Sequence, residues 1–331
     1  MWQPITDITE RSTDSDACAD AAWGIVAAAA QLSEELARGR RALSFAASRD
    51  ATLREVAPSD PDALLCWVPD AGWQLAPSSD AARHAVIDLY LPICSATAAR
   101  PITVGHLGQS LDGFIATHAG ESRWVTGQEN VLHSHRLRAL CDAVVVGAGT
   151  VAADDPRLTT RLVPGPNPLR VILDPGRRLS TSHRVFSDAE ADSIYVCAQS
   201  LVRPGERTFG RAVVVGVADV AAGGIDITEV GRLLRARGCA RVFVEGGGVT
   251  VSTFLEANLL DRLHVAIAPL LIGNGRPAIR LPPRAALGDC HRPRYRVFRM
   301  GADVLFDCDL TSPGDEADAV PDAQPRVARI I

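Results

Sequence analysis

Short apolar runs and amphipathic stretches alternate along the chain from residue 102 to residue 268. A run such as Ala143–Val146 is typical of a strand buried on both faces, whereas 226–237 has the spacing of an amphipathic helix. Strands that alternate with helices form parallel sheets covered by helices, so the pattern predicts an α/β fold with a mostly parallel sheet. The late strands 295–299 and 303–309 have no helical stretch between them and predict an antiparallel hairpin at one edge. The other strands are expected at 102–107, 169–173, 193–197, 212–215, 241–244 and 263–268, and the other helices at 127–140 and from 250.

The sequence pattern changes near residue 98, within a segment of small residues, 94–101, that is typical of a linker. We expect a small accessory α+β domain over 1–98, an α/β domain over 99–311, and an acidic, disordered tail over 312–331. The elements expected in the first domain are a helix over 17–47, strands at 64–68 and 73–75, and a second helix capped by Ser79 or Asp80 that runs to about Leu91.

Composition excludes several classes of protein. The 331 residues carry a net charge of −5 with the arginines scattered among acids, which argues against a nucleic-acid surface. The apolar run 23–30 is too short to span a membrane, and the polar start lacks the basic residues of a signal peptide, so we expect a cytoplasmic protein. The eight cysteines form no C-x-x-C pair and the eight histidines have no metal-ligand spacing, so no metal site is expected. There is no lysine, and hence no lysine base or Schiff base.

Three consecutive glycines, Gly246, Gly247 and Gly248, lie between a buried strand and a helix. Free amide groups and the helix dipole attract phosphate at such a point, and glycines let a ligand approach the backbone. A plain tight turn is the alternative, although such a turn rarely needs three glycines. Glu245 ends the strand, where open α/β sheets bind ligands; it could instead be a surface carboxylate or a cap.

A second glycine-rich turn, Gly147-Ala-Gly149, imitates a dinucleotide-binding fingerprint. A Rossmann unit needs a long helix directly after the glycines, but Asp154-Asp155-Pro156 interrupts this one. We therefore expect the glycines to approach a cofactor without forming a Rossmann domain. The nearby Arg138, Arg157 and Arg161 can clamp an anion, or they can be ordinary solvated charges.

Several ordered blocks together resemble the RibD carboxyl-terminal family, the reductase domain of riboflavin biosynthesis, over about residues 100–310. The blocks that carry the resemblance are Ser110-Leu-Asp-Gly-Phe-Ile-Ala116, Gly120-Glu-Ser-Arg-Trp124, His135-Arg-Leu-Arg-Ala139, Val146-Gly-Ala-Gly-Thr-Val151, Ala153-Asp-Asp-Pro-Arg-Leu-Thr159, Val244-Glu-Gly-Gly-Gly248 and Ala268-Pro-Leu-Leu-Ile-Gly273. The resemblance implies a dihydrofolate-reductase-like three-layer fold. It also implies a homodimer that reduces the ribosyl group of an aminouracil ribosylamine phosphate to a ribityl chain with NADPH, by hydride transfer to C1′.

The resemblance also assigns expected roles to residues of this chain. Glu245 and Asp154 are the candidates for assisting ring opening and proton delivery. The expected contacts to the sugar-phosphate substrate are Ser122, Arg138, Leu158, Arg161 and His106. The expected NADPH contacts are Gly108, Trp124, Gly147, Gly149, Thr150, Asp154, Gly246, Gly247, Gly248, Val249, Thr250, Val251 and Ser252.

Two departures from the family pattern keep other functions open. His106 and Phe114 stand where family members commonly carry basic residues, which leaves a same-fold reductase acting on another heterocycle in secondary metabolism as an alternative. The first domain lacks the H-x-E and P-C-x-x-C elements of the zinc deaminase found in bifunctional members. A non-catalytic nucleotide-binding protein is the alternative from a different class, and the joint presence of Ser122, Trp124, Asp154, Arg161 and Glu245 argues against it.

Overall fold

The computed structural model describes residues 13–77, 79, 84–220 and 223–313. The chain divides into two compact units, Met1–Thr97 and Ala98–Ile331. A tail is predicted over 312–331. Its first two residues belong to the last strand, and residues 314–331 lie outside the described residues.

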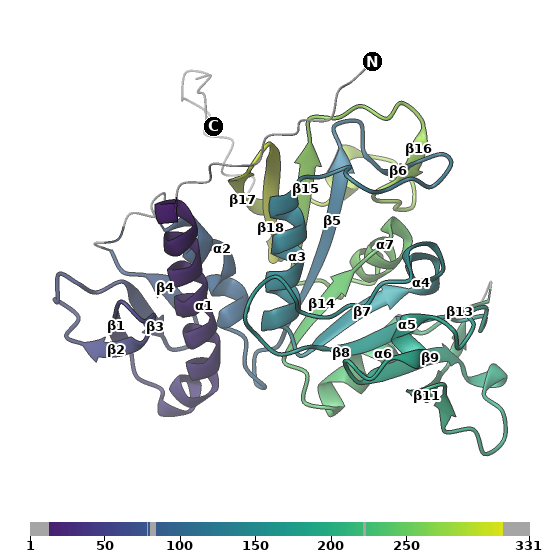
Figure 1. The fold of residues 1–331 in the computed structure, drawn as a ribbon, viewed down its shortest axis with the longest axis horizontal. Coiled ribbons are helices and arrows are strands. Elements are labelled where there is room, and N and C mark those ends of the chain that lie inside the picture. Colours follow the sequence, from purple (N-terminus) through teal and green to yellow (C-terminus); the bar gives the residue numbers. More distant parts are fainter. Residues whose placement is uncertain (1–12, 78, 80–83, 221–222, 314–331) are drawn as a thin grey trace. The chain divides into compact units, whose positions relative to one another are not determined.

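The first unit combines two helices with a four-stranded antiparallel sheet (Figure 1). Trp73 joins the two kinds of element, because its indole Nε1 donates to the carbonyl of Ala29 at 3.0 Å and to Ser33 Oγ at 2.9 Å. Its ring also packs edge-on against Trp67 and Phe45. The elements are α1 (Thr13–Gly39), β1 (Leu43–Ala47), β2 (Leu53–Val56), β3 (Leu65–Val68), β4 (Gly72–Leu75) and α2 (Ala85–Cys94), with strand order β2-β1-β3-β4.

Two predictions for this unit are wrong. The helix predicted over 17–47 ends at Gly39, because Arg40 takes a left-handed backbone with φ 50°, and β1 follows. The second helix begins at Ala85 rather than at Ser79, whose hydroxyl donates to the Leu64 carbonyl instead of capping a helix. Asp80 lies outside the described residues.

The second unit is built on a ten-stranded sheet of order β10-β11-β9-β8-β7-β14-β5-β15-β18-β17 (Figure 1). The seven strands from β11 to β15 are parallel, and β18 and β17 add the predicted antiparallel hairpin at one edge. The strands of this sheet are β5 (Ile102–Ser110), β7 (Ala143–Gly147), β8 (Leu169–Leu173), β9 (Ser193–Ala198), β10 (Thr208–Phe209), β11 (Ala212–Val217), β14 (Arg241–Glu245), β15 (Arg262–Ala268), β17 (Pro293–Met300) and β18 (Asp303–Pro313). The predicted α/β fold is confirmed.

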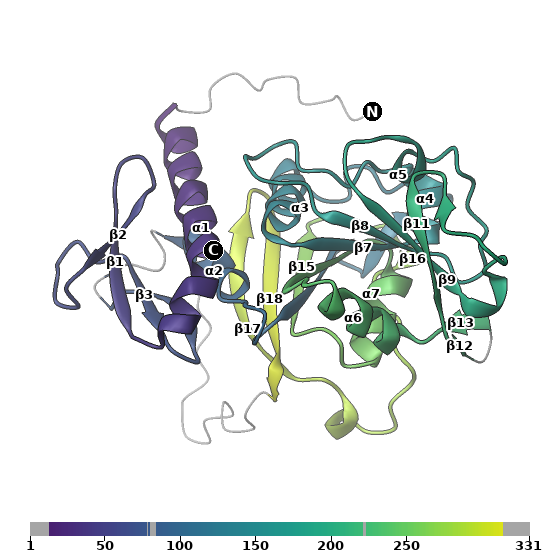
Figure 2. The same cartoon turned by 90° about the horizontal axis from the view of Figure 1, so that it is seen from below.

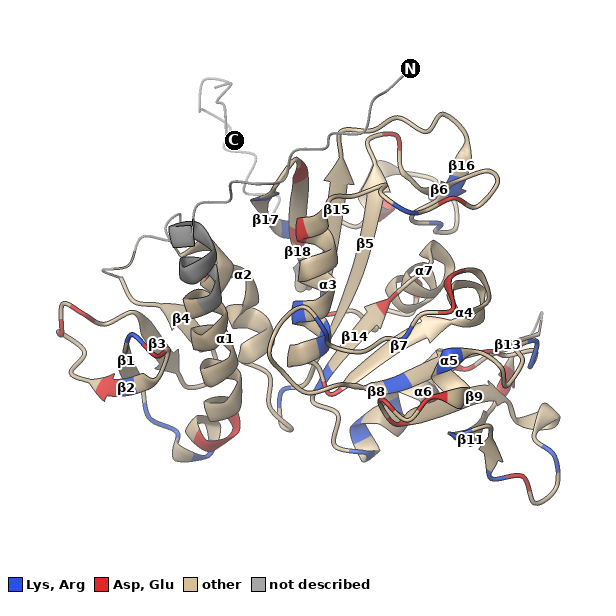
Figure 3. Ribbon diagram, viewed as in Figure 1, with Lys and Arg blue, Asp and Glu red and all other residues tan. Residues whose placement is uncertain are grey.

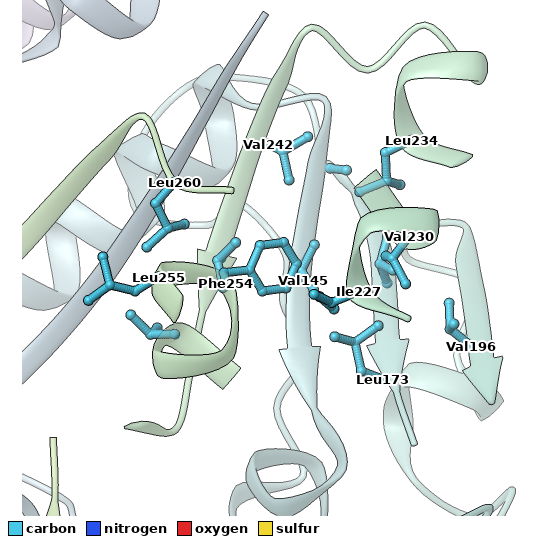
Figure 4. Close-up of a cluster of buried hydrophobic side chains, with 14 of the residues drawn as sticks. Val145, Leu173, Val196, Ile227, Val230, Leu234, Val242, Phe254, Leu255 and Leu260 are labelled. Carbon is cyan, nitrogen blue, oxygen red and sulfur yellow. The ribbon is translucent and has the colours of Figure 1, made fainter. Parts of the chain in front are cut away.

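Helices cover both faces of this sheet and give the unit three layers (Figure 2). One core packs side chains of β7, β8, β9 and β14 against α6 and α7; it includes Val145, Val242, Val230 and Phe254 (Figure 4). The neighbouring Val144 and Val146 are also fully buried but lie outside this cluster, as expected for a strand covered on both faces. The helices are α3 (Gln128–Leu140), α4 (Ala148–Asp154), α5 (Arg184–Ser187), α6 (Ile227–Ala236) and α7 (Gly248–Glu256), with short helical turns at Gln199–Leu201 and Leu287–Asp289.

Small strands that the sequence pattern did not predict complete the unit. The strand β6 (Phe114–Thr117) pairs with β16 (Gly275–Pro277), and β12 (Asp219–Val220) pairs with β13 (Gly224–Ile225). Both pairs contribute residues to the cavity described next.

Candidate active site

A cavity of about 1040 Å³ lies at the carboxyl ends of the parallel strands. Gly147, Leu173 and Glu245 end or nearly end β7, β8 and β14, and all three line it. This is the position at which open α/β sheets bind ligands. The wall also includes residues of β5, α3, α4, α7, β13 and β16.

The loop between β14 and α7 is shaped by its glycines. Gly246 has φ +130°, a conformation that side-chain-bearing residues rarely adopt. A Cβ on Gly248 would lie 2.0 Å from the Ala278 carbonyl oxygen, so the helix start packs directly on that backbone. The Gly247 amide donates to Thr150 Oγ1 at 3.0 Å and is thereby already paired. The start of α7 faces the cavity, and Val249 lies beside it with 73% of its surface exposed.

The glycine-rich turn after β7 packs against this loop. A Cβ on Gly147 would lie 2.4 Å from Thr250 Oγ1, so only glycine allows the two turns to approach. The helix α4 ends after seven residues, at Asp154, and Asp155 adopts a left-handed backbone. The prediction that no long Rossmann helix follows this turn is therefore confirmed.

Arg138 and Glu245 form an ion pair inside the cavity wall. Arg138 Nε donates to Glu245 Oε2 at 2.7 Å, and Nη2 donates to Oε1. The third nitrogen, Nη1, donates to the Thr159 carbonyl at 3.2 Å. Burial opposes the charge of Arg138, but Glu245 raises its pKa. The pair fixes a carboxylate at the end of β14 in one orientation.

Four arginines surround a smaller cavity of about 380 Å³ that shares Arg138, Asp154 and Arg161 with the larger one. Arg161 donates to Thr159 Oγ1 at 2.7 Å, and no carboxylate partner is found for it in the part of the chain that the structure describes. Burial and the charges of Arg138 and Arg157 lower the pKa of Arg161. This excess of positive charge suits an anion. The fourth arginine is Arg184.

Asp154 lies at the rim of both cavities. Burial raises its pKa, against the lowering effect of Arg123 and Arg276. A carboxyl group with a raised pKa retains its proton more readily, which is the property required of a proton donor.

The larger cavity brings together most of the predicted site residues. Those that line it are His106, Gly108, Ser122, Arg138, Gly147, Gly149, Thr150, Asp154, Arg161, Glu245, Gly246, Gly247, Gly248, Val249 and Thr250.

Four predicted ligand contacts do not line the larger cavity. Leu158 is buried, with φ +56°, and lines the smaller cavity. Trp124 is 76% exposed and is not part of the wall. Val251 and Ser252 are buried behind the helix start, where Ser252 Oγ accepts from the Arg280 amide at 2.8 Å.

Some wall residues were not among the predicted ligand contacts. His135 Nδ1 accepts from the Arg161 amide at 2.9 Å, and Asn130 and Arg276 also line the cavity. His135 and Arg161 are 26 positions apart in the chain, so only folding brings them together. Across the described ranges, no group of three or more His, Cys, Asp or Glu residues could hold a metal ion. None of the helices in the described ranges combines the length and the hydropathy of a membrane-spanning segment.

The buried histidines predict an acid-sensitive fold. Burial lowers the pKa of His106 to about 4, burial together with Arg138 lowers that of His135 to about 4, and burial also lowers that of His133. The unfolded chain then binds more protons, so stability should be complete above pH ~6.5 and fall as the pH drops towards ~4. His106 alone should cost about 2 kcal/mol of unfolding free energy at pH ~5. Urea unfolding at pH ~7.5 and ~5 measures the difference, and equal midpoints would contradict the assignment.

The profile of the RibD C-terminal domain family matches residues 102–294. The 2,5-diamino-6-ribosylamino-4(3H)-pyrimidinone 5′-phosphate reductase of Methanothermobacter thermautotrophicus is 37% identical over 215 residues, covering 63% of this chain and 97% of that protein. The riboflavin biosynthesis protein RibD of Aquifex aeolicus is 34% identical over 211 residues, covering 63% of this chain and 58% of RibD.

A solved structure shares the fold. It is a diaminohydroxyphosphoribosylaminopyrimidine deaminase/5-amino-6-(5-phosphoribosylamino)uracil reductase from Thermotoga maritima, with a TM-score of 0.52 and 26% identity, and the match covers 69% of this chain and 61% of that one. The chain therefore spans less than two thirds of these two longer relatives. The matched segment 102–294 begins with β5 and contains every residue that lines the larger cavity.

Proposed function

This chain belongs to the RibD C-terminal domain family of reductases, and we propose that it uses NADPH to reduce a 5-amino-6-(5-phosphoribosylamino)uracil-like substrate. The reaction converts the ribosylamino group to a ribitylamino group. The observation that carries the proposal is the larger cavity, in which a glycine-rich helix start meets the Arg138–Glu245 pair and Arg161. The glycine-rich helix start suits a dinucleotide, and the arginines suit a sugar phosphate.

The wall fits NADPH in shape and charge. The glycines after β14 carry no side chains that would fill the space, and the start of α7 offers amide groups and a positive dipole end to a phosphate. Val249 lines the cavity and is apolar and largely exposed, which suits a side chain that a bound cofactor covers. When bound, NADPH supplies the hydride that adds to C1′ of the ring-opened sugar.

The protein residues supply charge and protons. Arg161, whose guanidinium has no carboxylate partner among the described residues, is assigned to the substrate phosphate, and Ser122, Arg138 and Leu158 are assigned as further substrate contacts. Ring opening places a proton on the sugar ring oxygen and removes one from the glycosidic nitrogen, and reduction returns a proton to that nitrogen. Asp154 and Glu245 are assigned to these transfers because both line the cavity and the pKa of Asp154 is raised.

The preference for NADPH over NADH is assigned to Arg178. Its side chain is 76% exposed, with Nε 3.8 Å from Asp174 Oδ1, and the residue lines the larger cavity together with Pro175 and Ile225. Replacing Arg178 by Gln should raise the Kd for NADPH about 10- to 100-fold, because a charge-assisted bond to the 2′-phosphate is lost, and leave the Kd for NADH unchanged. Titration of the wild type and the variant with NADPH and with NADH measures the two Kd values. Arg232→Gln, on the exposed side of α6, is the control, and equal losses for the two cofactors would contradict the assignment.

Substrate-dependent oxidation of NADPH tests the proposed activity. Purified protein should oxidise NADPH only when the aminouracil ribosylamine phosphate is present. His106 in the cavity wall favours a second candidate, a reductase of the same fold that acts on another heterocycle. That candidate predicts NADPH binding without oxidation in this assay.

The family resemblance further leads us to expect a homodimer, which sedimentation velocity would measure.

A further inference from the structure

The turn after β8 contains a buried carboxylate to which the proposed reaction gives no role. Asp174 directly follows this strand and is 0% exposed. Its neighbours Leu173, Pro175 and Arg178 line the larger cavity, whereas Asp174 itself does not. Basic and acidic residues are mixed along the segments around β8, α5 and β9 (Figure 3). Burying a carboxylate is costly unless donors and a positive charge compensate it, so its partners indicate what it does.

One oxygen of Asp174 is used to fix the turn itself. The Leu179 amide and the Tyr195 hydroxyl both donate to Asp174 Oδ2 at 2.8 Å. The Arg177 amide donates to the Asp174 carbonyl at 3.0 Å, and Arg177 has a left-handed backbone with φ 51°. The segment 174–179 is therefore held in one shape, with Asp174 at its base.

The other oxygen of Asp174 interacts with Arg178. Within the described residues, Asp174 Oδ1 accepts no hydrogen bond, and Arg178 Nε lies 3.8 Å from it, at the distance of an ion pair. The Arg178 side chain is otherwise exposed, so this carboxylate is what restrains it. An arginine that is held at Nε keeps Nη1 and Nη2 for a ligand, and these two nitrogens can bind a phosphate at two points.

The preceding arginine, Arg177, has a different task. Its Nη1 and Nη2 donate to the two carboxylate oxygens of Glu206 at 2.5 and 2.6 Å. Its guanidinium also lies over the rings of Tyr195 and Phe209, 5.6 and 5.5 Å from their centroids. Arg177 thus fastens the turn to β9 and β10 and does not line the cavity. Of the two neighbouring arginines, Arg178 is the one that can receive a ligand.

We propose that Asp174 is a positioning residue that holds Arg178 with its terminal nitrogens free for the 2′-phosphate of NADPH, and that the two residues together set the preference for NADPH over NADH. This inference rests on the proposed function, which assigns Arg178 to that phosphate. Asp174 does not reach the cavity wall, so the nearer guanidinium dominates the interaction with a phosphate there. Without Asp174, the exposed Arg178 side chain would lose more conformational freedom on binding, which weakens the contact.

The test is titration of the wild type and Asp174→Asn with NADPH and with NADH, in the absence of substrate. Asparagine keeps the size of the side chain and an acceptor for the Leu179 amide and the Tyr195 hydroxyl, but it no longer attracts Arg178. The Kd for NADPH should rise about 3- to 10-fold and the Kd for NADH should stay unchanged. In an Arg178→Gln background the same change should have no further effect, because Asp174 acts through that arginine. Asp309→Asn, at a partly buried carboxylate on β18 that lines neither cavity, is the control.

Several outcomes would overturn this inference. Tighter NADPH binding by Asp174→Asn would show that the carboxylate repels the phosphate, and equal losses for both cofactors would show that Asp174 only maintains the fold. Arg178→Lys tests the orientation without changing the buried carboxylate. It keeps the charge but not the two terminal nitrogens, so it should lose about threefold or more of the preference, and a full preference would contradict the inference.

Other outcomes separate this inference from the proposed function. A wild type that prefers NADPH, with the same preference in Asp174→Asn, would refute the positioning role while the proposed function stands. A wild type that binds neither cofactor would refute the proposed function itself.

Discussion

Replacing Glu245 by Gln is expected to lower kcat by about 10²- to 10³-fold, the range typical of a lost general acid or base. Glu245 lies at the carboxyl end of β14 with both oxygens held by Arg138, so the change removes a fixed carboxylate from the cavity. The amide keeps nearly the same volume. The Kd for NADPH should therefore change by no more than about twofold, because the cofactor loop on α7 is untouched.

Steady-state kinetics and cofactor titration on the same preparations measure the two effects separately. Glu256→Gln is the matched control, since Glu256 is an exposed carboxylate at the end of α7. Equal losses in kcat and in NADPH affinity would contradict a catalytic role and leave Glu245 as a support for Arg138.

Replacing Gly248 by Ala is expected to disable cofactor binding. The new Cβ would lie 2.0 Å from the Ala278 carbonyl oxygen and 2.6 Å from that of Pro277, so α7 or the segment after β16 must move. Overpacking of this kind costs about 1–3 kcal/mol of stability. Because α7 starts at this residue, its amide groups would also leave their positions, and the Kd for NADPH should rise more than about tenfold.

Gly231→Ala is the control for this prediction. Gly231 lies within α6, and a Cβ there would meet nothing within 4 Å. Alanine is the better helix former, so this variant should gain about 0.4–1 kcal/mol and bind NADPH normally. Thermal unfolding and cofactor titration distinguish the pair. Normal NADPH binding by Gly248→Ala would show that the loop tolerates a side chain and that its shape does not set cofactor affinity.

The sequence predicted the elements whose signal is local. The parallel strands were found because buried runs such as Ala143–Val146 are apolar throughout, and the α7 start was found because three glycines follow β14. The long amino-terminal helix was extended too far. Leu43-Ser-Phe-Ala-Ala47 follows Gly39 without a proline, and a short alternating run of this kind does not separate strand from helix.

The contacts inside the site depend on residues far apart in the chain. Arg138 and Glu245 are separated by 107 positions, and His133 and His264 by 131. The sequence motifs and the family resemblance singled out Arg138 and Glu245 one at a time, but they did not predict that the two residues pair. The contacts of His133 with His106 and His264 were missed for the same reason, because the three histidines lie far apart in the chain. Parallel sheets create such contacts by placing distant strand ends side by side.

The most direct test of the proposed reaction uses NADPH labelled with deuterium at the transferable position of the nicotinamide. The protein is incubated without oxygen with this cofactor and the aminouracil ribosylamine phosphate, and the product is examined by mass spectrometry and NMR. We expect a ribitylamino product that has gained one deuterium atom, at C1′, and one proton, on the nitrogen. An unchanged substrate in the presence of bound cofactor would contradict the account and assign the cavity to a different substrate.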